Sequence, residues 1–326
     1  MRFTKSALCF AAAAAALALA APAFAAQPYP SRPIKLIVPF PAGGGPDMIA
    51  RELSTKVAAQ EGWTIVVDNR PGSGGNIGLD AAAKSAPDGY TLAMGQTSNM
   101  AINPSLYAKL PYNPQKDLAP IGLVASSPLA IAVASNSPYK SLKDILAAAK
   151  AQPESLYYAS SGSGTVAHLA TEQLQRIAQV KLTHVPYKGA AQGITDLLGG
   201  QIQLYVSSTV TLSPHIKNGK MRGLAVTSAK RTADLPSVPT VAESGYPGFQ
   251  AVTWFGLVGP ANLPKDVIAK VNAAFNKALL SPDVRTKLVE QGADVLGGTP
   301  EQFAALLQDE TVRWTKVVKE SGAKVD

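Results

Sequence analysis

The sequence of 326 residues contains one cysteine, Cys9, and three histidines. Cys9 lies in an N-terminal apolar run that we expect to be removed, so the mature chain has no thiol. This excludes disulfides, cysteine nucleophiles and thiolate metal sites. The histidines, His168, His184 and His215, lack the paired spacing of metal ligands. We therefore expect neither a metal nor a cofactor.

Charged residues are also scarce, at 16% of the chain, and 30 basic against 22 acidic residues give a net charge of +8. The basic residues are spread along the chain and form no cluster interleaved with aromatic residues, so we expect no nucleic-acid partner. A diffuse positive field suits the attraction of small anions. The hydrophobic content of 46% is too high for a disordered chain.

The known catalytic motifs are missing as well. The sequence has no G-x-S-x-G elbow and no phosphate-binding G-x-x-x-x-G-K-[ST] loop. Gly72, Gly74 and Gly78 resemble a dinucleotide fingerprint, but their second gap is three residues instead of two. We interpret residues 71–78 as a structural turn and expect no catalytic residue.

The N-terminus has the features of a signal peptide. Arg2 and Lys5 precede the apolar run at residues 8–21, and Ala23 and Ala25 form an A-x-A cleavage signature. We expect cleavage after Ala25 and export to the periplasm. No later run reaches the ~20 apolar residues of a membrane span.

The rest of the chain alternates short strands with helices, which is typical of parallel α/β sheets. A first set of strands is expected near residues 34–38, 64–68 and 91–95, and a second near 156–160, 182–187, 202–207 and 221–227. Two long extended segments, 121–134 and 251–259, are placed where the chain would cross between two lobes with separate cores. Three helices should follow, and Thr299, Pro300 and Glu301 begin the last of them. The expected organisation is a signal peptide (1–25), lobe 1 (26–124 and 250–326) and lobe 2 (125–249).

Ligands of open parallel sheets bind beyond the carboxyl ends of the strands, where helix N-termini expose free N–H groups. Two glycine-rich turns suit this role, PFPAGGGPD at residues 39–47 and SSGSGTVAHL at 160–169. Such glycines also occur simply to fit tight bends. His168 either braces the second turn or reaches the cleft, and Trp254 and Phe255 are either hinge core or cleft wall.

Several sequence strings resemble one family, the receptors of tripartite tricarboxylate transporters, or Bug receptors. The strings occur in the family's order along nearly the whole mature chain: PFPAGGGPD, NRPGSGGNIG (69–78), PDGYTL (87–92), AINPSLYAKLPYNP (101–114), VPYKG (185–189), PSVPTVAESGYPGF (236–249), WFGLVGP (254–260) and GGTPEQFAALLQDETVRW (297–314). The resemblance implies a two-lobed periplasmic-binding-protein fold, with a mostly parallel sheet flanked by helices in each lobe and two crossing strands. It also implies a monomer that passes its ligand to the membrane subunits of a transporter.

The resemblance further implies a small carboxylate, whether a dicarboxylate, a tricarboxylate or an aromatic carboxylate, held between the lobes by backbone donors of the two turns. The expected ligand-binding residues are Phe40, Ala42, Gly43, Gly44, Asp47, Ser161, Ser163, Gly164, Thr165, His168, Tyr187 and Ser207. The chain departs from the family at two places. It has Asn99 and Met100 where members often carry Thr-His, and it has Ser207 and Ser208 where members often carry an acid. Two alternatives remain: a sensor receptor that presents its ligand to a signalling protein, and a periplasmic enzyme acting on carboxylates.

Overall fold

The computed structural model describes residues 29–323 and 325. The predicted signal peptide, with Cys9 and the cleavage site, lies outside this range. All described helices and strands belong to one compact unit, Arg32–Asp326. None of these helices combines the length and apolarity needed to cross a membrane.

The first sheet is built around a short parallel group. Its strands are β1 (Ile34–Val38), β2 (Ile65–Asn69), β3 (Thr91–Gln96), β9 (Val252–Pro260), β4 (Leu118–Ala134) and the short β10 (Asp294–Val295). β1 pairs in parallel with both β2 and β3, whereas β9 is antiparallel to β3 and to β4. The carboxyl ends of β1 and β3 therefore lie at the same edge, which is where the first glycine-rich turn begins.

The second sheet repeats this plan. Its strands are β5 (Tyr157–Ser160), β6 (Thr183–Pro186), β7 (Leu204–Ser208) and β8 (Met221–Val226), together with the distal half of β4. β5 pairs in parallel with β6 and β7, and β4 is antiparallel to β7 and β8. The second glycine-rich turn leaves the carboxyl end of β5.

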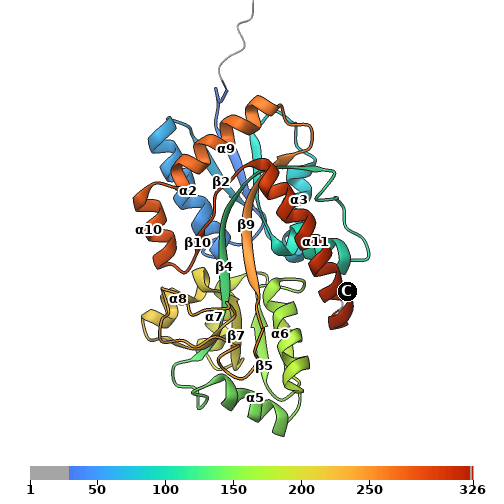
Figure 1. Ribbon diagram of the computed structural model, residues 1–326, viewed down its shortest axis with the longest axis vertical. Helices are drawn as coiled ribbons and strands as arrows, with labels where there is room; N and C mark the ends of the chain where they lie inside the picture. The colour runs from blue at the N-terminus through green and yellow to red at the C-terminus, as the bar shows by residue number, and fades with distance from the viewer. Residues whose placement is uncertain (1–28, 324, 326) are drawn as a thin grey trace, which may run out of the picture. The chain divides into compact units, whose positions relative to one another are not determined.

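Two strands connect the sheets. β4 is 17 residues long and pairs with strands of both sheets, and β9 runs antiparallel beside it (Figure 1). They correspond to the crossing segments predicted at 121–134 and 251–259. The predicted two-lobed α/β fold with two crossing strands is confirmed.

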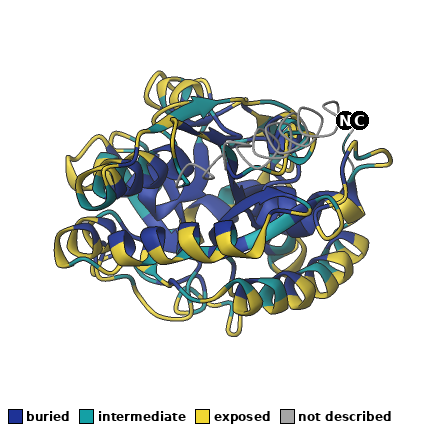
Figure 2. Cartoon of the chain, turned by 90° about the horizontal axis from the view of Figure 1, so that it is seen from above, coloured by how far each residue is buried: buried dark blue, intermediate teal, exposed yellow. Residues whose placement is uncertain are grey.

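Helices cover the sheets, with their outer faces exposed and the strands buried between them (Figure 2). They are α2 (Gly45–Glu61), α3 (Asn76–Ala83), α4 (Asn103–Leu106), α5 (Leu142–Ala151), α6 (Val166–Ala178), α7 (Ala190–Leu198), α8 (Thr209–Lys217), α9 (Lys265–Leu279), α10 (Pro282–Glu290) and α11 (Pro300–Ser321). The Thr299 hydroxyl caps α11 by accepting the N–H of Gln302, as the Thr-Pro-Glu start predicts.

The hydrophobic core differs from the expectation of one separate core for each lobe. A single buried cluster extends from Ile37 and Leu79 beside the first sheet, through Trp254, to Leu146 and Leu174 beside the second. A smaller cluster packs around α7 and α8. The cores merge because β4 and β9 are buried along most of their length, and because α11 contacts α6.

Candidate ligand-binding site

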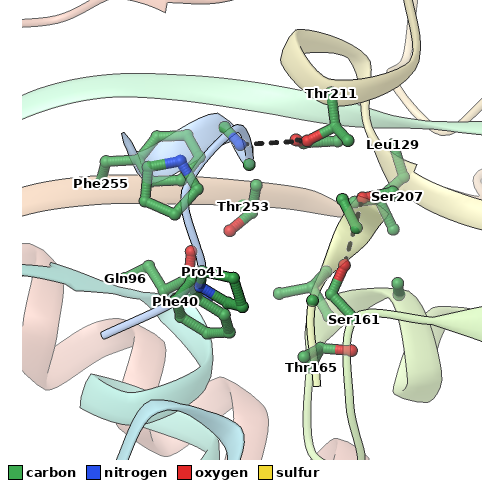
Figure 3. A pocket seen from close by; sticks show the side chains of 18 residues that line it. Phe40, Pro41, Gln96, Leu129, Ser161, Thr165, Ser207, Thr211, Thr253 and Phe255 are labelled. Atoms are coloured by element: carbon green, nitrogen blue, oxygen red, sulfur yellow. Dashed lines mark hydrogen bonds between the residues drawn. The ribbon is translucent and has the colours of Figure 1, made fainter. Parts of the chain in front are cut away.

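A cavity of about 530 Å³, counted with its open mouth, lies where both crossing strands meet the turns of both sheets. We call it the main cavity, and its lining residues are Phe40, Pro41, Gly44, Gly45, Pro46, Gln96, Leu129, Ser161, Thr165, Val166, Ala167, Gly189, Ala190, Ser207, Ser208, Thr211, Thr253 and Phe255. Figure 3 shows the rings of Phe40 and Phe255 on one side and the hydroxyls of Ser161 and Ser207 on the other.

The N-terminus of α6 opens into the main cavity. Thr165 is the N-cap residue: its Oγ1 donates to the Gly162 carbonyl at 2.8 Å and accepts the His168 N–H at 3.3 Å. The next two residues, Val166 and Ala167, line the cavity. Their N–H groups belong to the first turn and have no intrahelical acceptor. The helix dipole adds a partial positive charge at the same point, so this end of α6 is suited to an anion.

Gly164 and His168 hold the turn before α6 in shape. Gly164 has a φ of +80°, and a Cβ at this position would lie 2.8 Å from Asn103 Oδ1. The Gly164 N–H donates to Nδ1 of His168, whose ring stacks on His184 with 4.2 Å between the ring centroids. His168 therefore braces the turn and does not line the main cavity. Of the two alternatives left open by the sequence, this geometry favours the bracing role.

The paired histidines make stability depend on pH. Burial, and secondly the neighbouring His168, lowers the pKa of His184 to about 3, and burial also lowers the pKa of His168. An unfolded histidine titrates near 6.5, so below that pH the unfolded chain binds more protons than the folded chain. The stabilisation is complete above pH 6.5 and is lost as the pH falls toward 3.

We expect His184 alone to lower the free energy of unfolding by roughly 2 kcal/mol between pH 7 and pH 5, measured by urea titration. His184→Gln removes the titrating ring, so its stability should change less over this range. Equal slopes for the parent and the variant would contradict this assignment.

The first turn has few backbone donors left for a ligand. Asp47 is buried and accepts the Gly43 N–H at 2.9 Å, as well as bonds from Arg51 and Asn69. Burial raises the pKa of Asp47, but these hydrogen bonds outweigh it and hold the pKa below its usual value. The Gly45 N–H donates to Thr211 Oγ1 at 3.1 Å. The turn is thus fastened to α2, and through Gly45 to α8.

The predicted site residues divide into three groups. Five line the main cavity: Phe40, Gly44, Ser161, Thr165 and Ser207. Ser163 and Tyr187 instead line a neighbouring hollow, which shares Phe40 and Ser161 with the main cavity. Five line neither space: Ala42, Gly43, Asp47, Gly164 and His168. Of these, Asp47 and His168 support the turns that form the cavity wall.

The neighbouring hollow also includes a segment that we interpreted as purely structural. Gly72–Gly75, from the turn at 71–78, lines it, and a Cβ at Gly74 would lie 3.1 Å from the Ser163 carbonyl oxygen. Tyr187 Oη donates to Asp196 at 2.7 Å. Burial, with this hydrogen bond second, raises the pKa of Tyr187 to about 12. Lys188 lies in this hollow and not in the main cavity.

Several cavity residues were missed from the sequence. Thr211 and Ala190 follow β7 and β6, so the rule that ligands bind beyond strand ends could have indicated them. Gln96 ends β3 and could have been found in the same way. Thr253 and Leu129 lie on the crossing strands, where no local pattern marks them. On β9, Trp254 is core, with its Nε1 bonded to Glu310, whereas Phe255 is cavity wall.

The sequence matches one known protein family along most of its length. The family model described as "Tripartite tricarboxylate transporter family receptor" matches residues 49–323. The chain belongs to this receptor family. The Protein BugT of Bordetella pertussis is 39% identical over 308 residues, which cover 94% of each chain. The resemblance seen in the sequence strings is therefore confirmed.

Two similar solved structures are of proteins with a carboxylate. The R. palustris protein Rpa4515 with adipate is 35% identical, with a TM-score of 0.88, over 91% of this chain and 100% of that one. MatC of Rhodopseudomonas palustris with bound malate is 33% identical, with a TM-score of 0.84, over 89% of this chain and 100% of that one.

Proposed function

We propose that the protein is a periplasmic receptor that captures a small carboxylate in the main cavity and delivers it to the membrane subunits of a tripartite tricarboxylate transporter. The observation that carries this proposal is the N-terminus of α6. Val166 and Ala167, whose N–H groups have no acceptor within the helix, line a cavity that also contains buried hydroxyls. A carboxylate would satisfy both donors, and its charge would be stabilised by the helix dipole.

The family and its solved members support the same class of ligand, since two of them are described with adipate and malate. We further propose lobe 1 at 26–124 and 250–326 and lobe 2 at 125–249, because the second boundary precedes β9 and the first falls within β4. On this account Phe40, Gly44, Ser161, Thr165 and Ser207 are contact residues. Ala42, Gly43, Asp47, Gly164 and His168 act through the shape of the turns.

The proposal is tested by thermal unfolding of the mature protein with a panel of small carboxylates, uncharged sugars and amines. A ligand present at 100 times its dissociation constant adds ~2.7 kcal/mol to the free energy of unfolding, which raises the melting temperature by several degrees. We expect at least one carboxylate, and no amine, to do so. The carboxylate should be recovered chemically unchanged by NMR. A panel in which no carboxylate shifts the transition at millimolar concentration would contradict the proposal.

A further inference from the structure

Another cavity, which shares no residue with the main cavity, lies beside the crossing strand β4. It measures about 900 Å³ with its open mouth. Its wall consists of residues 228–234, which follow β8, of Pro128 on β4, and of Val289 and residues 292–294, where α10 leads into β10. We call it the hinge cavity, because its two sides belong to segments that we assign to different lobes.

Asp234 contributes a carboxylate to the hinge cavity that nothing in the described chain compensates. Its side chain is buried, since the residue is 8% exposed, and neither carboxylate oxygen has a hydrogen-bond partner among the described residues. The carboxylate lies against the opposite side of the cavity, where a Cβ at Gly292 would be 2.5 Å from Asp234 Oδ2. Burying an ionised carboxylate without a partner is costly. Asp234 therefore requires a donor or a cation.

Two hydroxyls of the same loop also lack partners. Ser228 Oγ and Thr232 Oγ1 are buried atoms of the cavity wall, and neither makes a hydrogen bond within the described part of the chain. Together with the two oxygens of Asp234 they give one short loop four unpartnered oxygen atoms. Oxygen ligands of this kind suit hard cations such as Ca²⁺, whereas nitrogen and sulfur ligands suit transition metals.

The charges around the hinge cavity also favour a cation. Arg231 belongs to the wall, but its guanidinium is paired with Glu243 at 2.9 Å. Asp294 adds a second carboxylate from β10. Lys230 is the other basic residue of the wall, and it is exposed. Once Arg231 is counted with Glu243, two carboxylates are balanced by only one ammonium group.

We propose that the hinge cavity binds a hard metal cation through Asp234, Ser228 and Thr232. Asp294 and water complete the shell of about six to eight oxygens that Ca²⁺ prefers. The sequence does not indicate this site, because its ligands are hydroxyls and carboxylates without the paired histidine spacing of a transition-metal site. The bound cation joins the loop after β8 to β10 and so stabilises the contact between the two proposed lobes. This proposal does not depend on the carboxylate ligand, and its failure would leave the proposed function standing.

Calorimetric titration of the mature protein with calcium, magnesium and sodium chloride tests the proposal. The protein is first treated with EDTA, which is then removed, and choline chloride keeps the ionic strength constant. We expect at least one of these cations to bind at a single site, and Asp234→Asn to weaken that binding at least about tenfold. Asp309→Asn is the matched control, since Asp309 is exposed on α11, and it should bind the cation as the parent does. Absence of binding by all three cations at millimolar concentration, or equal binding by Asp234→Asn, would overturn the proposal.

Thermal unfolding tests whether Lys230 is instead the partner of Asp234. Without the cation, Asp234→Asn should melt no lower than the parent, because it removes an unpaired buried charge. With the cation, the parent should melt several degrees higher than the variant. Lys230→Gln should keep the response to the cation. A cation-free Lys230→Gln that melts several degrees below the parent would show that Lys230 neutralises Asp234, which overturns the proposal.

A second variant keeps the test valid if Asp234→Asn does not fold. Thr232→Val keeps the shape of the side chain and removes only the hydroxyl, which has no partner to lose within the described residues. It should fold as the parent does and bind the cation about fivefold or more weakly in the same titration. Unchanged affinity in Thr232→Val would contradict the ligand set.

Discussion

Gly189→Val is expected to weaken ligand binding by at least about 100-fold. Gly189 precedes α7 and faces Pro41 in the turn after β1, so the two residues meet across the main cavity. A Cβ at Gly189 would lie 2.4 Å from Pro41 Cγ, which no folded protein tolerates without a shift. Its φ of 176° is extended and open to any residue, so the variant can fold. The substitution acts by forcing the two turns apart. Overpacking of this kind costs typically 1–3 kcal/mol, and the branched side chain should reach the upper end.

A second substitution separates this effect from a local loss of stability. Pro41→Ala removes the two ring atoms nearest to the added Cβ, at 2.4 and 2.8 Å. The double variant Gly189→Ala/Pro41→Ala should therefore bind more tightly than Gly189→Ala alone, in a calorimetric double-mutant cycle. Small-angle scattering should show ligand-induced compaction in the parent and less of it in Gly189→Val. Additive effects in the cycle would show that the contact across the cavity is not what the variant disrupts.

Much of the fold could be predicted from the sequence because local patterns decide it. β1 was expected at 34–38 and is found at Ile34–Val38, and the capped start of α11 at Thr299 is readable from three residues. The crossing strands were recognisable by their length alone. The merged core was not predictable, because it depends on how α11 contacts α6, and these helices are far apart in the chain.

The site was only partly predictable for a related reason. The sequence indicates which turns lie at strand ends, but not which atoms of a turn are already engaged. Asp47 was expected on the ligand, yet its carboxylate is bonded to Gly43, Arg51 and Asn69. Thr165 was expected to bind the ligand, and it lines the main cavity, yet its hydroxyl is already engaged in capping α6. Thr253 lies on the cavity wall only because β9 crosses there.

The Gly45–Thr211 bond illustrates the same limit. These residues are 166 positions apart, and nothing in either local sequence pairs them. The bond nevertheless occupies an N–H of the glycine-rich turn at residues 39–47, which the sequence predicts to bind a ligand. Long-range contacts of this kind determine which donors of a turn remain free, whereas local sequence indicates where the site lies.

The central claim is that a carboxylate binds the free N–H groups at the start of α6, and Val166→Pro removes one of them. Proline is tolerated at the first position of a helix, because its fixed φ is helical and the missing N–H has no intrahelical partner. The preceding residue, Thr165, has φ −73° and ψ 158°, in the region that a following proline favours. The helix, its cap and the cavity should therefore survive the substitution. The ligand should lose one hydrogen bond to a charged group, about 1.5 to 3 kcal/mol, or about ten- to a hundredfold in affinity.

Val166→Ala is the matched control, since it removes most of the side chain but keeps the N–H. The most direct measurement is calorimetric titration of the parent, Val166→Pro and Val166→Ala with a carboxylate that stabilises the parent, after circular dichroism has shown all three to be folded. We expect Val166→Pro to bind at least about tenfold more weakly than Val166→Ala. Equal affinities for the two variants would contradict the claim and place the carboxylate elsewhere.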